Sequence, residues 1–192
     1  MTEEMHGLDP LPLDCWLQLF GNDHPVAVEI GPGRGEFLLD SACGDAQRNF
    51  FAIEHSHAQA RGIAAKLAEH GTANARVICG DAVCLIELFP ARSVAVFHVQ
   101  FPDPWWKRRH QRRRLWTPRF AAALCRALVA GGTIELTTDV PDYFALAQRY
   151  LSAEPGLELV SARHSTALQS SFARKAVRRG VVILHSVHRR RE

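Results

Sequence analysis

A run of glycines behind an acidic residue is the part of this 192-residue sequence best suited to hold a ligand. The segment Glu29–Gly35, with the sequence EIGPGRG, follows an apolar run and leads into a predicted helix. The glycines Gly31, Gly33 and Gly35 let the backbone turn sharply and let a ligand approach it closely. A dinucleotide site would have the spacing GxGxxG, with a pyrophosphate at the helix N-terminus. Because the Glu29 carboxylate would repel a pyrophosphate, the loop favours a cationic ligand without phosphate.

S-adenosylmethionine is such a ligand, since its sulfonium and ammonium groups are both cations. Glu54 ends the next apolar run, where a carboxylate can accept hydrogen bonds from two ribose hydroxyls. Asp81 and Ala82 follow the third run, where Asp81 can bind an adenine amino group. Each feature has a simpler interpretation as a structural turn, a solvated acid or a helix cap. The carboxyl ends of parallel strands meet at the edge where ligands bind, so the combination predicts an S-adenosylmethionine site.

A proline-bracketed aspartate follows the fourth apolar run, Val94–Phe101. Pro102 and Pro104 flank Asp103, and each proline restrains both its own φ angle and the residue before it. This restraint aims the carboxylate, which predicts substrate chemistry beside the cofactor. The alternative is a rigid corner in which Trp105 and Trp106 pack into the core.

The net charge of +3 conceals two basic clusters. Residues 107–114 and residues 171–192 each carry a net charge of +6, which leaves −9 for the rest of the chain. A dense run of one sign is costly unless anions relieve the repulsion, as phosphate backbones do. A solvated charged face is the alternative, but the neighbouring tryptophans and candidate site favour RNA. The residues expected along the RNA are Arg109, His110, Arg112, Arg113 and Arg114.

Strand-like and helix-like segments alternate along the chain. The predicted strands are residues 26–30, 50–54, 76–79, 94–101, 133–138, 157–162 and 181–187, and the predicted helices are residues 36–43, 56–69, 118–128 and 141–151. This order predicts an α/β, Rossmann-like fold with a mostly parallel seven-stranded sheet and helices on both faces. The last two strands have no helix between them, so we expect them to pair antiparallel at one edge.

Composition narrows the class of protein further. The length suits one domain, residues 1–192, and 22% charged residues are ordinary for a soluble protein. The five cysteines form no CxxC pair, which argues against a disulfide framework or a metal site. No signal peptide or membrane span is recognisable, so we expect a cytoplasmic protein, monomeric or weakly dimeric.

Residues 101–114, with the sequence FPDPWWKRRHQRRR, resemble the FPDPWxKxRHxKRR signature of tRNA (guanine-N7-)-methyltransferases. The EIG at residues 29–31 and the NFFAIE at residues 49–54 resemble further elements of that family. The similarity extends over roughly residues 25–190. The basic signature is specific to the family, whereas many methyltransferases share the cofactor elements.

This resemblance implies a class I methyltransferase that transfers a methyl group from S-adenosylmethionine to guanosine N7 in the tRNA variable loop. It places Glu29, Glu54, Asp81 and Asp103 at the cofactor. Asp103 is also implied as the catalytic residue. The residues implied at the substrate are Lys107, Asp139, Ser170 and Arg174.

One departure from the family keeps two alternatives open. The family ends in a T-x-[FY]-E-x-[RK] element that holds the guanine, and here Ser170 replaces the threonine while Ala173 replaces the acid. A relative that binds tRNA and cofactor but has weakened catalysis is therefore one alternative. A nucleobase amino-methyltransferase is the other, although its [DN]PP[YFW] loop would need a proline at Trp105.

Overall fold

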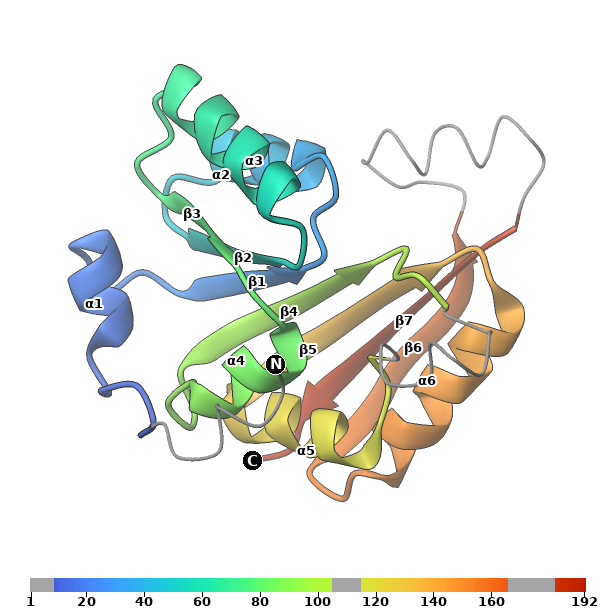
Figure 1. Cartoon of the computed structure of the whole chain (residues 1–192). Coiled ribbons are helices and arrows are strands. Elements are labelled where there is room, and N and C mark those ends of the chain that lie inside the picture. The colour runs from blue at the N-terminus through green and yellow to red at the C-terminus, as the bar shows by residue number, and fades with distance from the viewer. Residues whose placement is uncertain (1–8, 105–114, 166–181) are drawn as a thin grey trace.

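A computed structural model of the chain describes residues 9–104, 115–165 and 182–192. These residues form a seven-stranded sheet flanked by helices (Figure 1). The strands are β1 Val26–Ile30, β2 Asn49–Glu54, β3 Ala75–Cys79, β4 Val94–Gln100, β5 Leu128–Thr138, β6 Leu157–Ser165 and β7 Ile183–Arg190. The helices are α1 Cys15–Phe20, α2 Glu36–Gly44, α3 His57–Glu69, α4 Ala82–Leu88, α5 Pro118–Ala127 and α6 Pro141–Ala153.

The sheet has the strand order β3-β2-β1-β4-β5-β7-β6. β1 to β5 pair in parallel, and β7 runs antiparallel to both β5 and β6. This confirms the predicted seven-stranded, mostly parallel sheet with antiparallel pairing at one edge. The reversed strand is β7, which lies between β5 and the edge strand β6. The strand order reverses direction between β1 and β4, which is where open sheets of this kind form a ligand crevice.

The four predicted helices are confirmed as α2, α3, α5 and α6, and side-chain caps mark the starts of two of them. The Ser56 side chain accepts a hydrogen bond from the backbone N–H of Gln59 at α3, and the Thr117 side chain does the same for Phe120 at α5. Such caps satisfy amide groups that have no partner inside the helix. The sequence pattern missed α1 and α4. It also extended α5 by one residue, because Leu128 already has extended backbone angles and begins β5.

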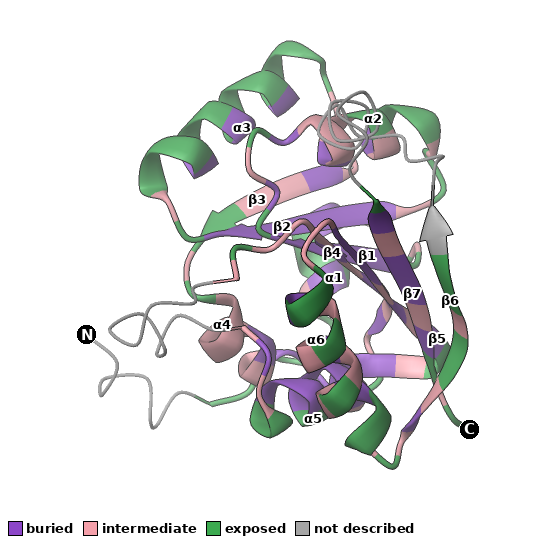
Figure 2. Ribbon diagram, turned by 90° about the vertical axis from the view of Figure 1, so that its right-hand side faces the viewer, coloured by how far each residue is buried: buried purple, intermediate pink, exposed green. Residues whose placement is uncertain are grey.

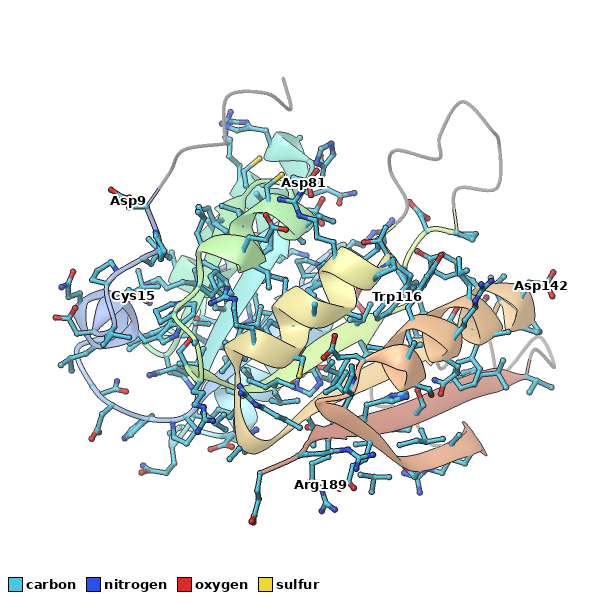
Figure 3. The ribbon with its side chains drawn as sticks, turned by 90° about the horizontal axis from the view of Figure 1, so that it is seen from below. Asp9, Cys15, Asp81, Trp116, Asp142 and Arg189 are labelled. Carbon is cyan, nitrogen blue, oxygen red and sulfur yellow. The ribbon has the colours of Figure 1, made fainter. Side chains whose placement is uncertain are left out.

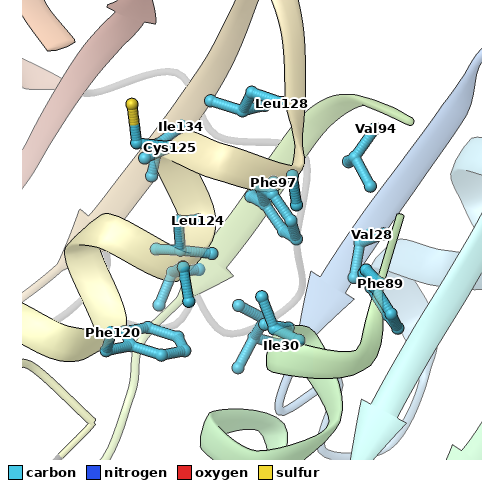
Figure 4. Packing of buried hydrophobic residues seen from close by; sticks show 14 of the residues in the cluster. Val28, Ile30, Phe89, Val94, Phe97, Phe120, Leu124, Cys125, Leu128 and Ile134 are labelled. Atoms are coloured by element: carbon cyan, nitrogen blue, oxygen red, sulfur yellow. The ribbon is translucent and has the colours of Figure 1, made fainter. Parts of the chain in front are cut away.

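Two apolar layers hold the helices to the sheet. α4, α5 and α6 cover one face, where Phe97 of β4 packs with Phe120 and Leu124 of α5 (Figure 4). On the other face α2 and α3 cover β1 to β3, with Leu38 and Ile63 in a smaller buried cluster. Figure 2 shows that burial is concentrated in the central strands, while the outward face of α3 is exposed. The core therefore fixes the strand ends that carry the candidate site.

No helix within the described ranges is long and apolar enough to cross a bilayer. All five cysteines are free thiols, and Cys79 and Cys43 are exposed. Among the described residues, no three metal-ligating side chains gather in one place.

Buried His188 predicts a loss of stability in acid. Its side chain is fully buried in β7, neither ring nitrogen has a hydrogen-bond partner among the described residues, and burial lowers its pKa to about 4. The unfolded chain takes up this proton near pH 6.5, so the free energy of unfolding falls as the pH drops from there towards 4. His188→Leu is expected to reduce that fall by up to about 1.4 kcal/mol per pH unit. Urea unfolding at pH 7, 6 and 5 measures it.

The exposed His70, at the end of α3, provides the control for His188. His70→Leu should leave the pH dependence of the wild type in place. Equal slopes for His188→Leu and wild type would contradict the assignment.

Candidate active site

The glycine segment turns across the carboxyl ends of β1 and β2. Gly31, Gly33 and Gly35 have φ angles of 69°, 57° and 73°, in the left-handed region that favours glycine. The Gly31 N–H donates to the carbonyl of Ile53 on β2, at 2.9 Å. A Cβ atom on Gly35 would lie 2.9 Å from Cγ1 of Ile63, so α2 and α3 also pack too closely here for a side chain. The sharp turn predicted from the sequence is confirmed.

Glu29 is a buried carboxyl group with an unsatisfied oxygen. Its side chain is 3% exposed, and Oε2 accepts no hydrogen bond from the described residues. Burial, with a smaller contribution from Glu54, raises the pKa of Glu29 to about 8. An unpaired buried carboxylate costs free energy that a cationic ligand would recover. Beside the glycine turn, Glu29 supplies a negative charge and an oxygen without a hydrogen-bond partner among the described residues. The ammonium group of S-adenosylmethionine needs both, so these residues fit that cofactor.

Glu54 and Asp81 lie at the ends of the next two strands and have different surroundings. Glu54 is buried, and its Oε1 accepts a hydrogen bond from the Ser56 N–H at 2.7 Å. Asp81 is exposed and caps α4, with Oδ1 accepting from the Val83 N–H at 2.8 Å (Figure 3). Each carboxylate is thus fixed by a local backbone amide. The structure brings Glu29, Glu54 and Asp81 to one edge of the sheet, as the sequence predicted.

The aspartate between prolines follows a strained turn at the end of β4. Phe101 has a φ angle of 48°, which a residue with a Cβ atom rarely adopts, and its N–H donates to the carbonyl of Thr137 on β5. Such outliers often mark functional sites. The exposed Asp103 follows two residues later, in the loop after β4, and β4 is the strand next to that of Glu29. Asp139, which is half-buried, follows β5 at the same edge.

The remaining predicted site residues fall outside the described part of the chain. They are Lys107, Arg109, His110, Arg112, Arg113, Arg114, Ser170 and Arg174. Their assignment to guanine or RNA therefore stays a prediction.

The sequence analysis missed a polar pair beside Glu29. On neighbouring strands, Nδ1 of His98 lies 3.4 Å from Oε2 of Glu135, and this contact is the main cause that lowers the pKa of Glu135. The ring of Phe37, from α2, meets the His98 ring edge-on at a centroid distance of 5.0 Å. The sequence carried a signal for this pair, because both residues interrupt otherwise apolar strands.

Arg126 was also missed, and it positions α4. Its guanidinium donates to the carbonyls of Ile86, Glu87 and Phe89, at 2.8–3.1 Å. Ile86 and Glu87 lie in the last turn of α4 and Phe89 follows it, where carbonyls lack the N–H partners of a helix interior; the Ile86 carbonyl also accepts from the Phe89 N–H. α5 thereby anchors the short helix that Asp81 caps.

Comparison with known proteins gives matches over most of the chain. A family model described as "Putative methyltransferase" matches residues 23–181. A tRNA (guanine-N(7)-)-methyltransferase of Rhodopirellula baltica is 32% identical, over 94% of this chain and 76% of the relative. The enzyme of the same name from Acidithiobacillus ferrooxidans is 35% identical, over 91% of this chain and 80% of the relative.

Solved structures agree on the fold. The 16S rRNA methyltransferase KamB superposes with a TM-score of 0.69 at 19% identity, covering 92% of this chain and 93% of that one. At this identity the likeness concerns the fold alone, which is that of class I methyltransferases. The family-model match and the sequence identities to the relatives show a closer relationship than the structural likeness does. This chain belongs to the tRNA (guanine-N7-)-methyltransferase family.

Proposed function

We propose that this protein transfers the methyl group of S-adenosylmethionine to N7 of a guanosine in the variable loop of tRNA. It would act in the cytoplasm, as a monomer or a weak dimer. Family membership supports the reaction. The main structural support for S-adenosylmethionine as the cofactor is the environment of Glu29. Its buried, unsatisfied Oε2 lies behind a glycine turn, where a cation without phosphate fits.

Three strand ends would hold the cofactor in this proposal. Glu29 receives the ammonium group, Glu54 accepts from the ribose hydroxyls, and Asp81 with Ala82 faces the adenine. The glycines Gly31, Gly33 and Gly35 allow the ligand to approach the backbone. When bound, S-adenosylmethionine supplies an electrophilic methyl group on a sulfonium. The local hydrogen bonds of Glu54 and Asp81 hold their carboxylates in place before the ligand arrives.

Guanine N7 carries a lone pair in the plane of the base, so no general base is required. The protein must hold N7 in line with the methyl–sulfur bond, which is catalysis by proximity and orientation. The methylated ring gains positive charge, and the Asp103 carboxylate would stabilise it. Asp139 would accept hydrogen bonds from N1–H and the exocyclic amine, with Lys107, Ser170 and Arg174 as further substrate contacts.

Incubation with labelled S-adenosylmethionine and unmodified tRNA, followed by nucleoside analysis, tests the proposal. The expected product is 7-methylguanosine at one position of the variable loop. A methylated exocyclic amine would favour the amino-methyltransferase alternative instead. Absence of any methylated guanosine, while S-adenosylhomocysteine still binds, would contradict the reaction and leave a binding protein.

The basic cluster is expected to set the salt dependence of tRNA binding. Replacing Arg112, Arg113 and Arg114 by alanine should weaken binding and lower the slope of log Kd against log salt by about 2 to 3, because each phosphate that an arginine neutralises adds roughly 0.7–0.9 to that slope. Filter binding between 50 and 200 mM salt measures the slope.

The exposed residues Arg61 and Lys66 on α3 provide a control, since they also carry positive charge. Their replacement by alanine should change the slope much less. A triple variant whose slope equals that of wild type would show that this cluster does not contact the phosphates.

A further inference from the structure

A row of ionisable side chains crosses three adjacent strands below the candidate site. In the sheet register Glu29 of β1 pairs with His98 of β4, and His98 pairs with Glu135 of β5. Residues paired in this way lie on the same face of a sheet, with Cα atoms about 4.8 Å apart. The two acids therefore flank one imidazole. Ala52, the partner of Glu29 on β2, adds no polar group to the row.

We propose that His98, held by Glu135, is a positioning residue that takes up the proton which Glu29 releases when the ammonium group of the cofactor binds. This inference rests on the proposed function, because the ammonium is that of S-adenosylmethionine.

Glu29 must lose its proton to bind a cation, and its own surroundings oppose that loss. The group is buried, Oε2 has no donor among the described residues, and the neighbouring acid Glu54 repels a second negative charge. In keeping with this, the pKa of Glu29 is raised to about 8, so the cofactor-free protein holds the proton at pH 7. Binding therefore needs a nearby proton acceptor or must release the proton to solvent.

His98 is suited to accept this proton. Imidazole gains and loses a proton in the range between pH 5 and 8. Its Nδ1 faces the Glu135 carboxylate at 3.4 Å, which stabilises the charged ring, and Nε2 is the second ring nitrogen that can carry a proton. From α2 the aromatic ring of Phe37 packs against His98. Other ionisable groups that act on the row are Glu54 of β2, His185 of β7 and Arg48 before β2.

The step conserves charge within the row. The O–H bond of Glu29 breaks, an N–H bond forms on His98, and no proton leaves the protein. In the bound state the charges along the row alternate in sign: the ligand ammonium is positive, Glu29 negative, His98 positive and Glu135 negative. Each positive group lies next to a negative one, which is the arrangement that Coulomb interactions favour.

Calorimetry of S-adenosylhomocysteine binding, in buffers of different ionisation enthalpy, counts the protons released. At pH 7 the wild type should release almost none, and its Kd should change little between pH 7 and 8. The His98→Gln variant should release about one proton when it binds the ligand. Its affinity should increase about tenfold for each unit by which the pH rises, up to pH 8. Glu135→Gln should shift both quantities in the same direction, since it removes the charge that stabilises protonated His98.

Two controls separate this inference from a structural effect. His70→Gln, at the exposed end of α3, should behave as wild type. Glu29→Gln combined with His98→Gln should release no more protons than Glu29→Gln alone. If His98→Gln and Glu135→Gln bind the ligand with the proton count of wild type, the inference is overturned while the proposed function stands. If the wild type binds no S-adenosylhomocysteine, the cofactor assignment fails, and this inference fails with it.

Discussion

Glu29→Gln is expected to stabilise the cofactor-free protein at pH 8 while weakening its affinity for the cofactor. The folded protein holds the Glu29 proton up to about pH 8, whereas a glutamate in the unfolded chain releases it near pH 4.5. The free energy of unfolding of the wild type therefore falls as the pH rises between these values. Glutamine cannot ionise, so the variant should gain on wild type by up to about 3–5 kcal/mol between pH 5 and 8.

Cofactor affinity should change in the opposite direction. A charge-assisted hydrogen bond contributes about 1.5–3 kcal/mol, so losing the carboxylate should raise the Kd for S-adenosylhomocysteine by roughly 10- to 150-fold. Urea unfolding at pH 5 and pH 8 measures the stability, and calorimetry at pH 8 measures the affinity. Opposite signs for the two effects distinguish a ligand-binding carboxylate from a structural one.

Glu69→Gln provides the matched control, because Glu69 is exposed at the end of α3. It should leave both the pH dependence of stability and the affinity of the wild type in place. A Glu29→Gln variant that loses stability equally at pH 5 and pH 8 would show that Glu29 has no raised pKa and serves the fold.

The strands and long helices were predictable from sequence because each carries its own local signal. Apolar runs predicted all seven strands, and Ser56 and Thr117 are side-chain caps that mark helix starts locally. α1 has no side-chain cap, and although Asp81 caps α4, helices of 6 and 7 residues are too short to carry a clear periodic pattern or to be stable alone. They depend on distant contacts. Trp16 of α1 packs edge-on against Phe51 and Phe89, and Arg126 anchors α4.

The candidate site likewise has features that the sequence predicts and features that only the folded structure shows. The sequence places acids at the ends of β1, β2 and β3, because a residue after an apolar run lies at a strand end. It does not show that Glu29 is buried while Asp81 is exposed, since burial depends on α2 and the neighbouring strands. The contact between His98 and Glu135 depends on the register of β4 with β5, which shifts between Val94 and Val96. No local pattern encodes that register.

Asp103→Asn is expected to slow methyl transfer by about 10²–10³-fold, the usual cost of losing one preorganised electrostatic contact in a transition state. Asparagine keeps the size of the side chain, and the turn is set by Phe101 and the two prolines, so the backbone should not change. The charge alone is removed, at the point where the purine ring becomes positive. Single-turnover kinetics with saturating tRNA and cofactor measures the step.

The distribution of the loss between rate and binding decides the role of Asp103. A group that acts on the transition state lowers kcat and leaves the Kd for tRNA nearly unchanged, whereas one that only holds substrate raises KM. Asp142→Asn, on the exposed first turn of α6, makes the same chemical change away from the strand ends and should retain wild-type kcat. If Asp103→Asn keeps kcat within about threefold, stabilisation of the methylated ring must come from elsewhere. The half-buried Asp139 at the end of β5 would then be the next residue to replace, because it is the other described carboxylate that we assign to the guanine.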